Sequence, residues 1–335
     1  MQLNVLQQLP DGILDCDADE LHQFFSGPSL INLKGQKDEV VFVSILLHGN
    51  EYTGWEAVKE LLKNHQDTLL PKSLSLFIGN IEAAREGARL LEGQKDYNRI
   101  WKRPSAEGDY AFTGQLLDEL EKIKPAMAID VHNNTGLNPH YACVNKLDKD
   151  FLHLATLFSR TVVYFICPDS VLSLALSEYC PAVTVECGKP DDIAGVEHVL
   201  NFLQACLHLD HFPSHPVAHQ DIDVFHTVAT VHVNKDISIG FGKDDADLRF
   251  IPELDTLNFN ELQVGTILAN TGKEEGVPLD VQNEQGIDIC DQYFANQDGR
   301  IVTTAPIMPS MLTLKKEIIK QDCLCYLMER CPLHQ

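Results

Sequence analysis

The chain has 335 residues, of which 44% are apolar and 22% are charged, and its formal net charge at pH 7 is −23. This length exceeds that of one compact hydrophobic core, so we expect one large domain and one smaller domain. The negative charge repels nucleic acid and anionic membrane surfaces, and no basic stripe offsets it, so we expect neither as a partner. The binding of an anionic substrate would therefore require arginines close to the binding site.

The start of the chain, MQLNVLQQLPDG, lacks the basic residues and the apolar run of a secretory signal. No uninterrupted apolar stretch of about 18 residues follows. We interpret the ten cysteines as reduced thiols, several of them in apolar strands. These features predict a soluble cytoplasmic protein and leave open whether it forms a homo-oligomer.

The first part of the chain alternates apolar strands with amphipathic helices. Residues 39–47 (EVVFVSILL) form a nearly unbroken apolar run, which is typical of a strand buried on both faces. Residues 52–64 place apolar side chains at helical spacing. The same pattern predicts strands at 74–80, 127–131, 161–166 and 182–187, and helices at 113–124 and 192–209, the last with Asp191 or Asp192 at its start. The alternation predicts an α/β fold, a mostly parallel sheet flanked by helices.

The pattern breaks around residues 208–220, where prolines and histidines gather. Beyond this point short β-type runs are separated by Gly, Asn and Asp turns. We therefore predict a large domain over residues 1–210 and a smaller β-rich domain over 211–335. No repeat at a fixed period is present, which disfavours solenoids and propellers.

Four side chains that can bind a metal or carry a proton lie at the ends of three predicted strands. His48 and Glu51 form an H-x-x-E pair, His132 directly follows the run MAIDV, and Glu186 ends the run AVTVE. In open α/β sheets, ligands bind beyond the carboxyl ends of the strands. The spacing of the H-x-x-E pair alone is weak evidence, but the shared location indicates one site.

Two histidines and one carboxylate leave one position open on a tetrahedral zinc ion, as in catalytic zinc sites. We therefore predict one Zn²⁺ per chain, held by His48, Glu51 and His132. Zinc lowers the pKa of a bound water to about 7, so that this water would be the nucleophile, and Glu186 would take and later deliver its proton. The alternative for Glu186 is a structural ion pair with an arginine or lysine.

The segment KDYNRIWKR, residues 95–103, places Asn98 beside Arg99. Arg99 can bind a carboxylate with two hydrogen bonds, and Asn98 can add a third. Arg89 could polarise a scissile carbonyl or hold a charge. The alternative is that all three are polar surface residues.

Four motifs in this order resemble the succinylglutamate desuccinylase and aspartoacylase family, within the zinc carboxypeptidase superfamily. The motifs are HGNEYTG at 48–54, DYNRIW at 96–101, IDVHNNTG at 129–136 and VTVECGKP at 183–190. The resemblance covers roughly residues 40–190, and the β-rich tail resembles the second domain of that family. It implies a zinc-carboxypeptidase-like catalytic domain that cleaves the amide bond of a small N-acyl amino acid.

The resemblance also implies a role for each matching residue. His48, Glu51 and His132 match the metal ligands, and Glu186 matches the catalytic acid and base. Asn98 and Arg99 match the clamp for the substrate carboxylate. Arg89 matches a catalytic arginine if an insertion precedes the D-x-N-R motif, and Asp96 would then orient a ligand histidine or Arg89.

The sequence departs from the aspartoacylase pattern in one respect. Aspartoacylases have a further arginine before the catalytic glutamate, and between His132 and Glu186 this chain has only Arg160. The role is not transferred to Arg160, which disfavours N-acetylaspartate as the substrate.

The sequence allows three alternatives to the hydrolysis of a small N-acyl amino acid. A zinc carboxypeptidase acting on peptides or cell-wall fragments would use the same metal ligands. The C-terminal segment could be a metal or redox module, because Cys323, Cys325, Cys331 and His334 could form a Cys3His zinc set, although alternating cysteines in an apolar run are more often buried on one strand face. A descendant that keeps the fold without catalysis is the third.

Overall fold

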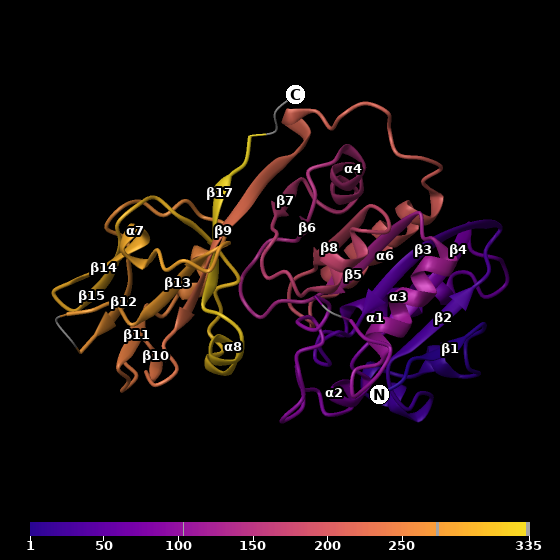
Figure 1. Cartoon of the computed structure of the whole chain (residues 1–335), viewed down its shortest axis with the longest axis horizontal. Coiled ribbons are helices and arrows are strands. Elements are labelled where there is room, and N and C mark those ends of the chain that lie inside the picture. Colours follow the sequence, from indigo (N-terminus) through magenta and orange to yellow (C-terminus); the bar gives the residue numbers. More distant parts are fainter. Residues whose placement is uncertain (103, 273–274, 333–335) are drawn as a thin grey trace. The chain divides into compact units, whose positions relative to one another are not determined.

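The computed structural model describes residues 1–102, 104–272 and 275–332, and it divides into two compact units (Figure 1). The first unit comprises Met1–Asn133 and His140–Asp223, and the second comprises Asn134–Pro139 and Val224–Gln335. The predicted fold class is confirmed, because a mostly parallel sheet flanked by helices forms the first unit and the C-terminal part is β-rich.

The strands of the first unit lie in the order β1-β2-β4-β3-β5-β8-β6-β7. Their bounds are β1 Asn4–Leu6, β2 Ser29–Leu33, β3 Lys37–Ile45, β4 Lys72–Ile78, β5 Met127–His132, β6 Tyr141–Val144, β7 Thr161–Tyr164 and β8 Ala182–Glu186. The central strands β4, β3, β5 and β8 are parallel to one another. In contrast, β2 is antiparallel to β4, and β6 is antiparallel to β8.

Strands β3 and β5 lie at the centre of the sheet and carry runs of buried, mainly apolar side chains on both faces. Val41, Phe42 and Val43 of β3 are at most 1% exposed, and all of β5 is buried. A parallel strand covered by helices on both sides requires such a run. Strands β1, β2 and β6 were not predicted, since they are short and do not follow the strand–helix alternation.

The helices of the first unit are α1 Thr53–Lys63, α2 Ile81–Arg85, α3 Phe112–Ile123, α4 Lys149–Phe158, α5 Leu172–Leu176 and α6 Ile193–His208, with 3₁₀ helices at Ile13–Asp15, Ala18–Gln23 and His219–Asp221. Helix α1 packs against α6 and β5. Asp192 is the N-cap of α6, as predicted, and its side chain accepts a hydrogen bond from the amide of Ala194. Such a cap stabilises a helix by about 1 kcal/mol.

The second unit contains strand β9, to which both β13 and β17 pair antiparallel, with β16 beside β17, and a sheet in the order β10-β11-β12-β15-β14. The elements are β9 Asp223–Val233, β10 Ile239–Phe241, β11 Leu248–Phe250, β12 Ile267–Thr271, β13 Leu279–Asn283, β14 Phe294–Gln297, β15 Arg300–Thr303, β16 Met308–Ser310, β17 Cys325–Arg330, α7 Cys290–Tyr293, α8 Lys316–Gln321 and a 3₁₀ helix at Leu254–Leu257. The core of this unit includes Val231, Phe250 and Phe294.

The short segment Asn134–Pro139 is held inside the second unit by hydrogen bonds. The Thr135 hydroxyl donates to the Thr313 hydroxyl at 2.9 Å, and the amide of Met311 donates to Asn138 Oδ1 at 3.0 Å. Gly136 is needed here, since a Cβ would lie 1.9 Å from the carbonyl oxygen of Leu312. Within the described parts of the chain, no helix is both long enough and apolar enough to span a bilayer.

Candidate metal centre

The candidate site lies at the carboxyl ends of the central strands β3, β5 and β8 of the first unit. These three strands are parallel neighbours, so their carboxyl ends lie together. His132 is the last residue of β5, and in the strand register it pairs with Glu186, the last residue of β8. His48 and Glu51 lie between the end of β3 and the start of α1.

His48, Glu51 and His132 form a compact cluster of metal-binding atoms. One ligand atom from each residue lies within 4.8 Å of the others, and the three residues are 3%, 5% and 3% exposed. The Nδ1 atom of His48 is 2.8 Å from Glu51 Oε1, and the Nδ1 atom of His132 is 2.8 Å from Glu51 Oε2. The two imidazole Nδ1 atoms therefore face the same carboxylate.

Each histidine is also oriented by a second carboxylate. His48 Nε2 lies 3.0 Å from Asp96 Oδ1, and His132 Nε2 lies 3.0 Å from Asp130 Oδ2. Because a carboxylate oxygen can only accept, Asp96 and Asp130 favour a proton on each Nε2, and Glu51 favours a proton on each Nδ1. A metal ion at the Nδ1 atoms would replace the Nδ1 protons, while the carboxylates at Nε2 would keep the two rings oriented.

Arg89 links two of the carboxylates. Its guanidinium lies 3.4 Å from Glu51 Oε1 and 3.2 Å from Asp96 Oδ2. Asp96 thus contacts both His48 and Arg89, the two neighbours that the sequence offered for it. The arginine lies at the candidate metal site and compensates part of its negative charge.

The acidity of the cluster depends on its internal charges. Burial on its own would raise the pKa of Glu51, but the imidazoles of His48 and His132 outweigh burial and hold that pKa far below its usual range. Burial would lower the pKa of His132, but Asp130 and Glu51 raise it well above its ordinary value. Burial and Arg89 oppose protonation of His48, yet Glu51 and Asp96 raise its pKa as well. The raised pKa values mean that protons on these imidazoles would compete with a metal ion for the ring nitrogens.

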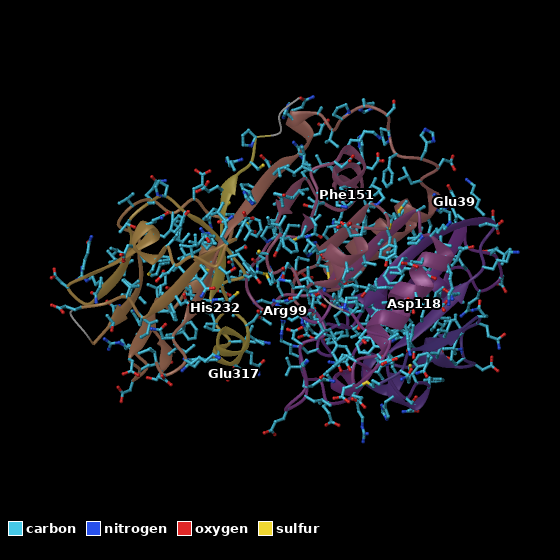
Figure 2. All side chains as sticks on the ribbon, viewed as in Figure 1. Glu39, Arg99, Asp118, Phe151, His232 and Glu317 are labelled. Atoms are coloured by element: carbon cyan, nitrogen blue, oxygen red, sulfur yellow. The ribbon has the colours of Figure 1, made fainter. Side chains whose placement is uncertain are left out.

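The other predicted site residues are Asn98, Arg99 and Glu186. Asn98 contacts His132, Arg99 follows Asn98 in the chain, and Glu186 pairs with His132 in the strand register. Asn98 Nδ2 is 3.4 Å from His132 Nε2, and Asn98 Oδ1 accepts a hydrogen bond from the amide of Leu172. Arg99, labelled in Figure 2, follows Asn98 and donates to the Asn98 carbonyl. Glu186 is 8% exposed. Neighbouring side chains of parallel strands in register lie on the same face, about 5 Å apart, so Glu186 faces the same side as His132.

The backbone that leads into the cluster is strained and closely packed. Leu46, between β3 and His48, has φ 56° and is fully buried. A non-glycine residue in this left-handed conformation is typical of functional sites. Gly49 packs on the α2 backbone so closely that a Cβ would lie 2.2 Å from the carbonyl carbon of Ala83. The turn after β3 is therefore fixed by close packing.

The C-terminal cysteines give no second metal site in the described residues. Cys323 and Cys325 are buried, Cys331 is half-buried, and His334 lies outside the described residues. Burial raises the pKa of Cys331, which disfavours the thiolate that zinc requires. Over residues 1–102, 104–272 and 275–332, one group of three or more histidine, cysteine, aspartate or glutamate side chains could hold a metal ion, and it consists of His48, Glu51 and His132.

Two residues that contact the cluster, Asp130 and Asn133, were not predicted from the sequence. Asp130 is fully buried and lies two positions before His132, on the same side of β5. A charged residue in an otherwise apolar strand was the signal that could have found it. The backbone amide of Asn133 donates to Glu51 Oε2 at 3.2 Å, and a contact of this kind leaves no mark in the sequence.

Comparison with known proteins shows which family the first unit resembles in sequence. Residues 39–198 match the family model described as the succinylglutamate desuccinylase/aspartoacylase catalytic domain, which confirms the resemblance indicated by the four motifs. No curated protein sequence matches the chain.

Several solved structures share the fold. One is a succinylglutamate desuccinylase from Chromobacterium violaceum, with 19% identity, a TM-score of 0.52, and coverage of 80% of this chain and 84% of that chain. Another is a succinylglutamate desuccinylase/aspartoacylase from Rhodobacter sphaeroides, with 12% identity, a TM-score of 0.58 and coverage of 90% and 88%. Murine aminoacylase 3 has 14% identity, a TM-score of 0.55 and coverage of 88% and 96%. At these identities the structural likeness shows the fold alone.

Proposed function

We propose, from the premise that residues 39–198 carry the succinylglutamate desuccinylase/aspartoacylase catalytic domain, that this protein is a zinc-dependent hydrolase of small N-acyl amino acids. The amide bond between the acyl group and the amino acid is the bond cleaved. The observation that carries the proposal is the convergence of His48, Glu51 and His132 within 4.8 Å, with Glu186 in register beside His132.

The donor atoms fit zinc. Two imidazole nitrogens and one carboxylate leave a position open for water or substrate. With zinc at the Nδ1 atoms, Asp96 and Asp130 would accept hydrogen bonds from the protonated Nε2 atoms and keep the two rings oriented. Bound at this position, zinc would lower the pKa of a water molecule and polarise the acyl carbonyl.

The side chains around the metal ligands would transfer the proton, bind the substrate carboxylate and compensate the charge of the ligands. Glu186 takes the proton of the attacking water and gives it to the nitrogen of the leaving amino acid. Arg99 binds the carboxylate of the substrate, and Asn98 adds its Nδ2 donor, since its Oδ1 is held by the Leu172 amide. Arg89 keeps Glu51 and Asp96 in place and limits the charge repulsion between them.

We also propose what kind of ligand the protein binds and in which cellular compartment it works. The ligand is a small anionic molecule, and local arginines overcome the repulsion of a chain whose net charge is −23. All ten cysteines are free thiols, which supports a reducing compartment such as the cytoplasm.

A metal analysis combined with a glutamate variant tests the function. We expect one zinc per chain, and we expect Glu186→Gln to keep the zinc but to lower kcat by about 10²- to 10⁴-fold, the usual contribution of a general base. Glu121→Gln, on the exposed side of α3, is the matched control and should behave as the parent. Undiminished turnover by Glu186→Gln would remove Glu186 from the mechanism.

The substrate panel should contain N-acetyl and N-succinyl amino acids together with short peptides that have free C-termini. Hydrolysis of the acyl amino acids is the expected result. Cleavage of the peptides alone would favour a carboxypeptidase instead.

A further inference from the structure

The side chain of Asn133 connects the segments that carry the metal ligands and Glu186. It is 4% exposed and directly follows His132. Its Oδ1 accepts from the amide of Thr53 at 3.3 Å, and its Nδ2 donates to Thr53 Oγ1 and to the carbonyl of Gly188, both at 2.9 Å. Because the Thr53 amide can only donate and the Gly188 carbonyl can only accept, the orientation of the side-chain amide is determined.

Cys187 adds a second tie between the ends of β5 and β8. Its thiol donates to the carbonyl of His132 at 2.8 Å, and its sulfur lies 3.3 Å from Asn133 Nδ2. The backbone amide of Cys187 also donates to the His132 carbonyl, at 3.0 Å. The residues that follow Glu186 are therefore fixed to the residues that follow His132.

The backbone and the side chain of Asn133 contact different parts of the site. Its backbone amide contacts Glu51 Oε2, so that contact remains whatever side chain occupies the position. Its side chain contacts the first residue of α1, Thr53, and the turn after β8. Removing the side chain should thus leave the metal ligands in place and release the end of β8.

We propose that Asn133 is a positioning residue that holds Glu186 in line with the metal ligands by tying the end of β8 to the start of α1. This inference rests on the proposed function, in which Glu186 moves the proton. Asn133 acts through the backbone at Cys187 and Gly188.

Kinetics and metal content test the proposal together. Asn133→Leu keeps the size of the side chain and removes its hydrogen bonds. We expect kcat to fall by about 10- to 100-fold, as for other residues that orient an active site from outside, with KM and zinc content close to the parent values. Thr53→Val removes one of the two shorter contacts of Nδ2 and should give a smaller loss. An unchanged kcat in Asn133→Leu, or a loss of zinc in proportion to the loss of activity, would overturn the proposal.

A second measurement is independent of activity. Cys187 and Cys206 are both fully buried, but only Cys187 contacts Asn133, and Cys206 lies on α6. We expect the alkylation rate of Cys187 in folded Asn133→Leu, followed by peptide mass analysis, to rise about tenfold or more while that of Cys206 stays at the parent value, because the opening is local. Equal increases at both cysteines, or no increase at Cys187, would overturn the proposal. If the parent protein hydrolyses no acyl amino acid, the proposed function fails and these rates still decide the role of Asn133.

Discussion

Replacing Asp130 by asparagine tests whether the buried carboxylate behind His132 strengthens metal binding. Asp130 is fully buried, and its Oδ2 lies 3.0 Å from His132 Nε2. Its other oxygen, Oδ1, has no hydrogen-bond partner among the described residues, so the charge acts mainly on the histidine. Asparagine keeps an acceptor for the Nε2 proton but removes the charge that makes the imidazole a better ligand.

We therefore expect Asp130→Asn to weaken zinc binding by about tenfold, at the lower end of the effect of such outer carboxylates. Tenfold corresponds to about 1.4 kcal/mol of binding free energy. Asp96→Asn should have a smaller effect, because the Asp96 side chain is 17% exposed and shares its charge with Arg89.

Competition between the protein and a chromophoric chelator measures the zinc Kd of these variants. Asp118→Asn, on the exposed side of α3 and labelled in Figure 2, removes a charge far from any predicted ligand and serves as the control. The reasoning is refuted if Asp130→Asn binds zinc as tightly as the control.

Two further predictions follow from the cluster and its backbone. Because the pKa values of His48 and His132 are raised in the metal-free protein, zinc must displace their protons, so the zinc Kd should increase as pH falls and proton release should accompany binding. Calorimetry in buffers of different ionisation enthalpy measures the protons released, and a pH-independent Kd would contradict the prediction. Gly49→Ala should lower the free energy of unfolding by about 1–3 kcal/mol, since the added Cβ overlaps the α2 backbone. Gly27→Ala, where the nearest atom is 3.7 Å away, is the control in the denaturant titration, and equal stability of the two variants would refute this packing argument.

The central strands could be predicted because each one is marked by an apolar pattern in its own short stretch of sequence. The runs that became β3, β5 and β8 are apolar on both faces, and this pattern is visible in the sequence itself. Parallel strands place their carboxyl ends together, so the sequence could predict that His48 and His132 lie near one another and that Glu186 ends a strand at the same side of the sheet. Arg89 and Asp96 were harder to assign, since their contact crosses an irregular loop.

The rest of the site depends on contacts that periodicity does not encode. The hydrogen bonds of Asn133 to Thr53 and Gly188 arise from the register of neighbouring strands and the turns that follow them. Strands β2 and β6 escaped prediction because each is antiparallel to a neighbour in the central group and no helix connects it in the expected alternation. Asn134–Pro139 belongs to the second unit through bonds to residues far along the chain.

The membership of Asn134–Pro139 in the second unit has a practical meaning for dissecting this protein. A protease that cuts within residues 210–220 separates the polypeptide into two pieces, but the N-terminal piece keeps the segment that Thr313, Met311 and Asn258 surround in the intact fold. The pieces should therefore copurify after cleavage. A fragment truncated near residue 210 would expose Gly136 and its neighbours without the backbone they pack on, so such a fragment is a poor substitute for the whole protein.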